Sequence, residues 1–184
     1  MQARFLLLAL AVLLATLAGI ALWLDRVADA PGPVTIAPTS VEASAGAIYA
    51  ARFTDVDGKE QMLGQWHSKL LVINFWATWC APCREEMPLL AKLQTEFGPQ
   101  GLQIVGIAAD SRLNVSNFIK ESPMPYPLLA DEARAIEFTK RVGNRLGLLP
   151  YTLVLRPSGD VILTRLGVVS EPEMRKLIVN NLQK

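Results

Sequence analysis

The sequence predicts an α/β domain in which helices cover both faces of a mixed central sheet. Two nearly continuous apolar runs, 70–76 and 102–108, are typical of strands that are covered on both faces. Between them, apolar residues recur at helical spacing as far as Phe97, and Gly98 and Pro99 supply a stop. A strand, a helix and a second strand in this order predict a parallel pair with a right-handed crossover.

Turn residues and helix caps predict the remaining elements. Clusters of turn-forming residues at 55–58 and 157–160 predict two hairpins, the second of them antiparallel and placed after Pro150. A capping box that starts at Ser170 opens a C-terminal helix. The further strands are expected at 49–53, 60–63, 152–155 and 161–166, with a short apolar stretch at 126–129, and the further helices at 112–121, 133–142 and 170–182.

The N-terminal segment is predicted to anchor the chain in a membrane. Residues 5–24 carry no charge and are long enough to cross about 30 Å of hydrocarbon as a helix. The tripeptide at 28–30 has the pattern of a signal-peptide cleavage site, which leaves a cleaved signal as the alternative. However, the apolar run exceeds the usual length of such signals, and Pro31 follows the tripeptide directly.

This pattern divides the 184-residue chain into three parts. We expect a transmembrane signal anchor at 1–25, a flexible linker at 26–47 and one folded domain at 48–184. The linker is rich in Ala, Pro, Ser and Thr and shows no sustained period. Because Arg4 flanks the N-terminal end of the span, the domain should face the periplasm from a bacterial inner membrane.

Charge and cysteine content narrow the function. The 18 Lys and Arg residues against 17 Asp and Glu give a net charge of +1, so no broad basic field is available for nucleic acid. Two cysteines cannot form the multi-bridge framework of small secreted domains, so the fold must depend on an apolar core. The cysteine pair is therefore available for chemistry.

The two cysteines stand between an expected strand and an expected helix, in the motif Trp79-Cys80-Ala81-Pro82-Cys83. At the first turn of a helix, the unpaired N–H groups and the macrodipole favour an anion, so the Cys80 thiol can ionise below its free pKa of ~8.5. Cys80 is predicted to be the nucleophile that forms a mixed disulfide with a partner. Cys83, one turn further along and less exposed, can then attack that disulfide and release the partner in reduced form.

The cysteine pair has other conceivable uses. A zinc site normally needs four ligands, and beyond the cysteines the chain offers only His67. Covalent haem attachment would require a His directly after Cys83, where Arg84 stands. A purely structural disulfide stays open as an alternative, although a loop of two residues restrains little chain entropy. We expect no metal or organic cofactor, because the dithiol itself carries the electrons.

The run 74–88 (NFWATWCAPCREEMP) resembles the thioredoxin superfamily, specifically its membrane-anchored TlpA/ResA-like branch. The resemblance covers roughly Tyr49 to the C-terminus and includes the segment 149–152. It implies a thioredoxin-like fold and disulfide exchange with protein partners. It also implies that Pro150 is a cis proline packed against the cysteines, and that the backbone of Leu149 docks the substrate peptide as an added strand. The surround of the two sulfurs is expected to comprise Trp79, Ala81, Pro82 and Pro150.

The resemblance also gives Glu86 a role. Thioredoxin has a buried Asp at the position of Asn74, which cannot exchange a proton at physiological pH. The TlpA/ResA-like branch instead has a Glu three residues after its second active-site cysteine, and Glu86 occupies that position on the helix face of Cys83. A partly buried carboxylate with a raised pKa could help to deprotonate the Cys83 thiol. The alternative is a solvated side chain like that of Glu85.

The resemblance further implies the direction of electron transfer and the partner proteins. Relatives of this type are tethered reductants that deliver electrons to oxidised cysteines, often those of apocytochrome c, and a DsbD/CcdA-type membrane transporter recharges them. A thiol oxidase or disulfide isomerase of general periplasmic substrates is the second hypothesis. A copper-binding assembly protein is the third, although on this fold such proteins usually separate their cysteines by three residues and add a distal His, and this chain has neither.

Overall fold

The computed structural model describes residues 16, 19–20 and 43–182. The chain divides into two units, 1–37 and 38–184. Of the expected anchor only Thr16, Gly19 and Ile20 are described, and they are helical; the rest of it, and the linker as far as residue 42, lie outside the described residues. Among the helices in the described part of the chain, none is both long and apolar enough to cross a membrane.

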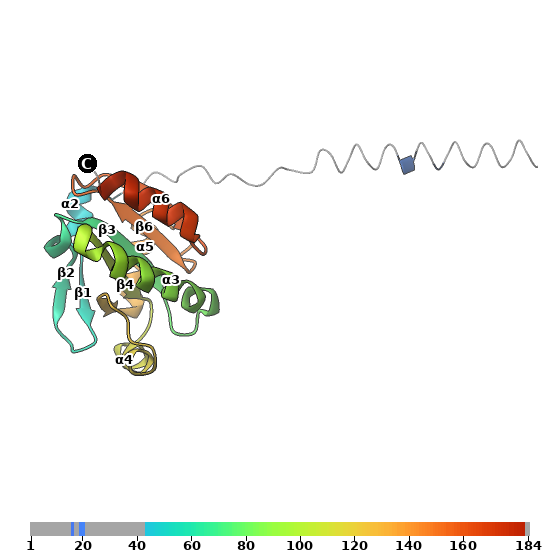
Figure 1. Cartoon of the computed structure of the whole chain (residues 1–184). Coiled ribbons are helices and arrows are strands. Elements are labelled where there is room, and N and C mark those ends of the chain that lie inside the picture. The colour runs from blue at the N-terminus through green and yellow to red at the C-terminus, as the bar shows by residue number, and fades with distance from the viewer. Residues whose placement is uncertain (1–15, 17–18, 21–42, 183–184) are drawn as a thin grey trace, which may run out of the picture. The chain divides into compact units, whose positions relative to one another are not determined.

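Two parallel strands form the centre of a seven-stranded sheet with the order β2-β1-β5-β4-β3-β6-β7. Figure 1 labels β1, β2, β3, β4 and β6 of this sheet. Strand β3 (Leu70–Trp76) pairs with β4 (Leu102–Ala108) along its whole length. Every residue of β3 is buried, as its continuous apolar run predicts. Helix α3 (Ala81–Phe97) connects the two strands, so the predicted strand-helix-strand unit is confirmed.

The outer strands extend this pair on both sides. Strand β6 (Tyr151–Leu155) runs antiparallel to β3 and forms the predicted hairpin with β7 (Val161–Leu166). On the other side, β5 (Leu128–Ala130) is parallel to β4. The second hairpin consists of β1 (Arg52–Asp55) and β2 (Glu60–Met62), and the other helical segments are α2 (Ala45–Tyr49), η1 (Leu63–Trp66), η2 (Gly98–Gln100), α4 (Arg112–Glu121), α5 (Glu132–Arg141) and α6 (Glu171–Leu182).

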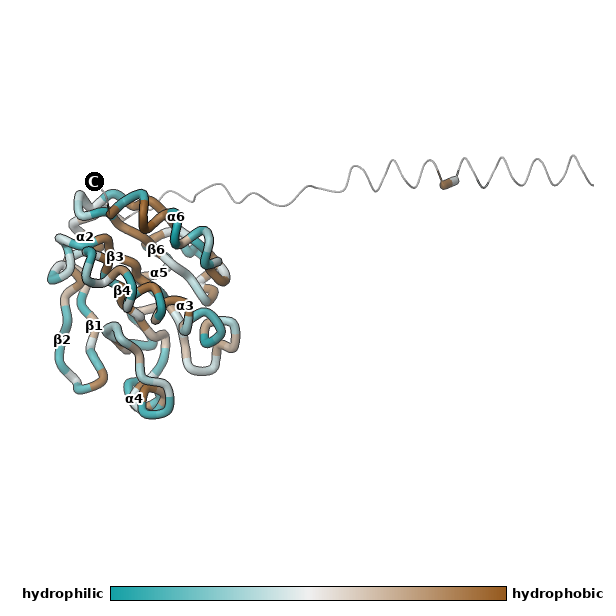
Figure 2. Tube along the Cα trace, viewed as in Figure 1, coloured by the Kyte–Doolittle hydropathy of each residue, from teal (hydrophilic) through white to brown (hydrophobic). Residues whose placement is uncertain are grey.

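Apolar side chains pack into two clusters. Met87 of α3 and Met174 of α6 belong to one cluster, which also contains both cysteines. Phe53 and Phe138 belong to the other cluster, with their ring centroids 5.5 Å apart, and Phe138 comes from α5. Along β3, residues 70, 72 and 76 belong to the first cluster and residues 71, 73 and 75 to the second, because neighbouring side chains of a strand point to opposite faces. Helices therefore cover both faces, as predicted, and Figure 2 shows the hydrophobic residues concentrated in the central strands.

The start of the domain differs from the expectation. Residues 45–47 were placed in the linker, but they form the first turn of α2. The Ser44 hydroxyl oxygen accepts a hydrogen bond from the Ala47 N–H at 3.3 Å, and Ile48 is fully buried. The first strand accordingly begins at Arg52. A single apolar residue in an Ala-rich run has no detectable period, which is why the sequence pattern missed this helix.

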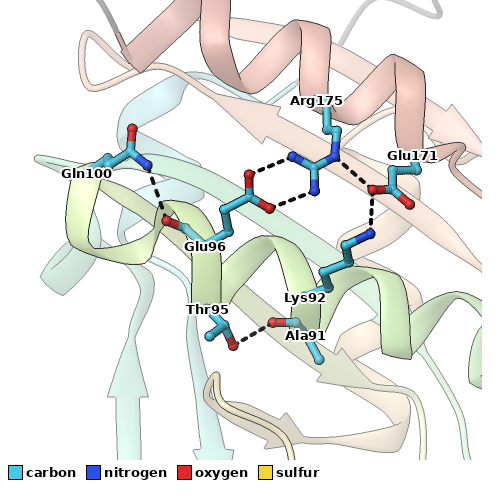
Figure 3. A network of polar contacts seen from close by, with 7 residues as sticks. All are labelled: Ala91, Lys92, Thr95, Glu96, Gln100, Glu171 and Arg175. Carbon is cyan, nitrogen blue, oxygen red and sulfur yellow. Dashed lines mark hydrogen bonds and ion pairs between the residues drawn. The ribbon is translucent and has the colours of Figure 1, made fainter.

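A network of charged side chains joins α3 to α6 (Figure 3). The guanidinium of Arg175 on α6 binds both carboxylate oxygens of Glu96 on α3, each at 2.6 Å. Its Nε also donates to Glu171, which accepts a second bond from Lys92 of α3. Isolated exposed ion pairs contribute little stability, but a bidentate pair within a network restrains geometry. The network therefore helps to hold α6 against the helix that carries the cysteines.

Burial of Ile48 predicts that α2 belongs to the folded unit. In the fragment 38–184, Ile48→Ala should lower the free energy of unfolding by about 2–5 kcal/mol, because it leaves a cavity in the core. Val179→Ala, at a position that is 39% exposed on α6, is the matched control and should change it little. Urea unfolding of both variants with the disulfide intact measures the difference. Equal, small effects would show that α2 adds nothing to the core.

Candidate active site

Cys80 and Cys83 lie at the start of α3, just after the connection from β3. Cys80 is the N-cap of α3 and Cys83 stands in its first turn. Their sulfurs form a disulfide with an S–S distance of 1.98 Å. The Cys80 sulfur also accepts a hydrogen bond from the Cys83 N–H at 3.3 Å. The Cys83 N–H, which has no acceptor within the helix backbone at this terminus, thus points at the sulfur of Cys80. This arrangement stabilises a thiolate.

The two sulfur positions differ in accessibility. Cys80 is 5% exposed and Cys83 is fully buried, so only Cys80 offers any surface to a partner. Beside it, the side chain of Trp79 is 69% exposed, and Ala81 and Pro82 are exposed in the first turn of α3. These three residues are thus exposed neighbours of Cys80 and Cys83 in the sequence. Trp76, by contrast, is fully buried in the core cluster of the cysteines.

Pro150 lies at the end of the sheet where β3 leads to the cysteines. The Leu149–Pro150 peptide bond is cis, as the resemblance implies. The next residue, Tyr151, pairs with Phe75 near the end of β3, and the Gly167 N–H donates to the Pro150 carbonyl at 2.9 Å. Pro150 is buried and Leu149 is half-buried. Both residues expected to contact substrate therefore lie directly before β6, the strand that neighbours β3.

Glu86 is buried more deeply than the sequence predicts. It lies one turn beyond Cys83 on α3, with an exposed fraction of only 2%. One carboxylate oxygen accepts a hydrogen bond from the Asn74 side-chain amide at 2.7 Å, and the other accepts the Val169 N–H at 3.0 Å. Burial raises the pKa of Glu86, and the hydrogen bonds from Val169 and Asn74 oppose this only in part. Glu86 is thus unlike Glu85, which is exposed.

Asn74 extends the polar contacts of Glu86 across the sheet. Its amide nitrogen also donates to the Thr152 hydroxyl on β6 at 3.1 Å. Its carbonyl oxygen and the hydroxyl of buried Tyr126 have no hydrogen-bond partner among the described residues. Burial and the nearby charge of Glu86 raise the pKa of Tyr126. Thr152 and Tyr126 were not expected at the site, because only tertiary packing brings Thr152 to Asn74 and Tyr126 near Glu86.

Asp110 is a further residue of the site that the sequence pattern did not indicate. It follows β4 and is buried, and its carboxylate binds both the backbone N–H and the hydroxyl of Thr78, two residues before Cys80. A signal did exist, because Asp110 stands just beyond the carboxyl end of an expected strand. Carboxyl ends of adjacent parallel strands meet at one edge of a sheet.

The side chains of the described residues offer no group of three or more His, Cys, Asp or Glu that could hold a metal ion. Both cysteines are engaged in the disulfide. The arrangement is suited to dithiol-disulfide chemistry: a disulfide at a helix N-terminus, one cysteine less deeply buried than the other, and a buried carboxylate on the same helix.

Comparison with known families agrees with this geometry. A sequence profile of the Redoxin family matches residues 38–178. The chain belongs to the Redoxin family. Its relatives place it in the TlpA/ResA-like part of the thioredoxin superfamily, and it is a protein-disulfide oxidoreductase.

The similar proteins cover most of the folded unit. Thiol-disulfide oxidoreductase ResA of Bacillus cereus is 30% identical over 122 residues, which are 66% of this chain and 68% of the relative. ResA of Bacillus subtilis is 32% identical over 118 residues, 64% of each chain. Among solved structures, a thioredoxin-related protein from Neisseria meningitidis serogroup B is 33% identical, with a TM-score of 0.64 over 72% of this chain and 99% of that one.

The raised pKa of Glu86 predicts a pH dependence of stability. In the folded state the Glu86 carboxyl keeps its proton at pH values above its ordinary pKa of 4.5. Its contribution to the free energy of unfolding is therefore fully present below pH 4.5. It is lost as the pH rises through the folded-state pKa, by at most about 1.4 kcal/mol per pH unit. Urea unfolding of the oxidised protein at a series of pH values measures this loss.

Glu86→Gln has no proton to lose at this position, so its free energy of unfolding should not show this decrease. The free energy of unfolding of the wild type relative to this variant should therefore fall as the pH rises above 4.5. Glu85→Gln, one residue away and exposed, should follow the wild type. Parallel curves for the wild type and Glu86→Gln would show that Glu86 titrates like a solvated side chain.

Proposed function

We propose that the protein reduces disulfides of protein substrates outside the cytoplasm, with Cys80 as the attacking thiol and Cys83 as the resolving thiol. The observation that carries this proposal is the asymmetry of the pair. Cys80 keeps an exposed fraction of 5% and its sulfur accepts the Cys83 N–H at the helix terminus, whereas Cys83 is fully buried one turn before Glu86. A thiolate at the less deeply buried position suits attack on a partner, and a fully buried thiol suits an intramolecular second step.

The exchange begins from the dithiol form. The Cys80 thiolate attacks one sulfur of the substrate disulfide, so a Cys80–substrate S–S bond forms as the substrate S–S bond breaks, and one substrate thiolate leaves. Cys83 then loses its proton and attacks the Cys80 sulfur. This step forms the Cys80–Cys83 disulfide and releases the second substrate thiolate. The substrate gains two electrons and two protons, which the dithiol loses, so we propose that no metal or organic cofactor is required.

Glu86 is proposed to take the proton of Cys83. Its position on the same helix face and its raised pKa support this role, because a base works best with a pKa near the working pH. The hydrogen bonds from Asn74 and Val169 hold both carboxylate oxygens in place. Neither donor can itself act as a base, so within this group of side chains Glu86 alone can serve.

The substrate is proposed to dock across Leu149 and Pro150 and against Trp79. The exposed indole and the half-buried Leu149 give an apolar surface at the end of the sheet that leads to Cys80. A backbone segment of the partner could add to Leu149 as an extended strand. An apolar, extended segment that carries a disulfide is the kind of partner that fits this surface.

Oxidised apocytochrome c is the proposed substrate, and a DsbD/CcdA-type transporter is the proposed electron donor. In this account residues 5–24 span the bacterial inner membrane and the domain faces the periplasm. The uncharged run in the sequence supports this placement. A measured reduction potential separates this reductant from an oxidase, since ~−270 mV for thioredoxin and ~−120 mV for DsbA mark the two ends of the range.

Removal of the resolving thiol should trap the partner. In cells that produce the full-length chain, Cys83→Ser should accumulate mixed disulfides between Cys80 and its substrate, because a hydroxyl is a far weaker nucleophile than a thiol. Non-reducing electrophoresis followed by mass spectrometry identifies the trapped proteins. Cytochrome c precursors are the expected adducts.

The matched control is Cys80→Ser, which keeps only the buried sulfur and should trap much less. If Cys80→Ser traps partners and Cys83→Ser does not, the two roles are reversed. A spread of unrelated secreted proteins on Cys83→Ser would instead indicate an oxidase or isomerase.

A further inference from the structure

Asp110 binds four neutral donors at the edge of the active site. One carboxylate oxygen accepts the Thr78 N–H at 3.1 Å and also the Thr78 hydroxyl. The other accepts the Ser111 N–H at 2.7 Å and the Asn114 side-chain amide at 2.8 Å. The side chain is 4% exposed, and no ion pair of Asp110 occurs among the described residues. Although burial opposes ionisation, these hydrogen bonds together lower the pKa of Asp110.

Thr78 lies inside the turn that delivers Cys80 to α3. The Cys80 N–H donates to the Ala77 carbonyl at 3.1 Å, which closes a four-residue turn with Thr78 as its first central residue. A second bond, from the Ala109 N–H to the Trp76 carbonyl at 2.8 Å, joins the ends of β3 and β4. Asp110 therefore ties the turn before Cys80 to the end of the neighbouring strand.

The contact between Asp110 and Thr78 matters most when the cysteine pair is reduced. In the oxidised form the covalent bond to Cys83 holds the Cys80 sulfur at the start of α3. After reduction that bond is gone, and the turn 77–80 is held by its hydrogen bonds. A Cys80 thiolate is stabilised only while its sulfur stays over the free N–H groups of the helix, because the effect falls off within the first turn.

We propose that Asp110 is a positioning residue that holds Cys80 at the N-terminus of α3 in the reduced form, and so sets the stability of its thiolate. This inference rests on the proposed role of Cys80 as nucleophile. The charge of Asp110 by itself would act in the opposite sense, since a nearby negative charge disfavours a thiolate. The sign of the change in the Cys80 pKa therefore separates positioning from simple electrostatics.

The equilibrium between the protein and glutathione also depends on the stability of the Cys80 thiolate. One oxidised protein and two glutathione molecules give one dithiol protein and one glutathione disulfide, so two electrons and two protons enter the cysteine pair. A Cys80 thiolate that is less well held makes the dithiol less stable. The variant protein then contains less dithiol at the same glutathione ratio.

Two variants test the proposal. Asp110→Asn keeps the volume but can accept at most part of the four hydrogen bonds, and Thr78→Val removes only the hydroxyl and leaves the charge of Asp110 in place. In Asp110→Asn the Cys80 pKa should rise and the equilibrium constant for reduction should fall about three- to tenfold, the tenfold limit being about 30 mV. Thr78→Val should shift both quantities in the same direction by less. The pKa is read from thiolate absorbance and from the pH dependence of alkylation.

Asp131→Asn is the matched control. Asp131 caps α5 through the Arg134 N–H at 3.1 Å, as an acidic N-cap should, but no hydrogen bond joins it to the turn 77–80 in the described residues. It should leave the Cys80 pKa unchanged. A lowered Cys80 pKa in Asp110→Asn together with no change in Thr78→Val would leave only a charge effect and overturn the proposal. Lost stability with no pKa shift in either variant would do the same. Both readouts need no protein partner, so failure to trap a substrate with Cys83→Ser would count against the proposed function alone.

Discussion

The contact between the N-terminus of α3 and the sulfur of Cys80 is the interaction on which the site depends. It requires that the chain turn sharply after β3 and begin a helix within four residues, so that the free N–H of Cys83 faces the Cys80 sulfur. The parallel pairing of β3 with β4 fixes where that turn lies. The helix then covers one face of the sheet through Met87 and its apolar neighbours. Reactivity at Cys80 is thus a consequence of how the central strands pair.

A buried carboxylate one turn beyond Cys83 is the second constraint. An ionised group out of contact with water costs free energy unless donors replace the lost water. Asn74 and Val169 provide two such donors to Glu86, and they come from β3 and from the loop before α6. The loop must therefore stay against α3, and the Arg175–Glu96 pair between α6 and α3 favours the same arrangement. The cost of burial is what raises the pKa of Glu86, and the proposed role as a base depends on that raised pKa.

The sequence predicted those parts of the molecule that depend on short-range pattern. The buried strands β3 and β4 follow from continuous apolar runs, and the placement of Cys80 follows from a motif between a strand and a helix. Helix α2 was missed, because one buried side chain, Ile48, holds a segment whose composition is that of a linker.

The contacts that complete the site join residues far apart in the chain. Thr78 and Asp110 are 32 residues apart, and Glu86 and Val169 are 83 apart. No local period encodes such a pair, since it depends on which strand ends and loops the topology brings together. The depth at which Glu86 is buried depends on the same long-range packing, so its partly buried position was the most that the sequence could indicate.

The central claim is that Glu86 takes the proton of Cys83, and the rate of the second exchange step tests it most directly. A mixed disulfide between Cys80 and a small thiol is prepared, and the release of that thiol is followed over a range of pH by stopped flow. Glu86→Gln should slow release by on the order of 10²-fold and lose the rise in rate that accompanies ionisation of Glu86, whereas Glu85→Gln should match the wild type. Release at the wild-type rate and with the wild-type pH profile in Glu86→Gln would contradict the account.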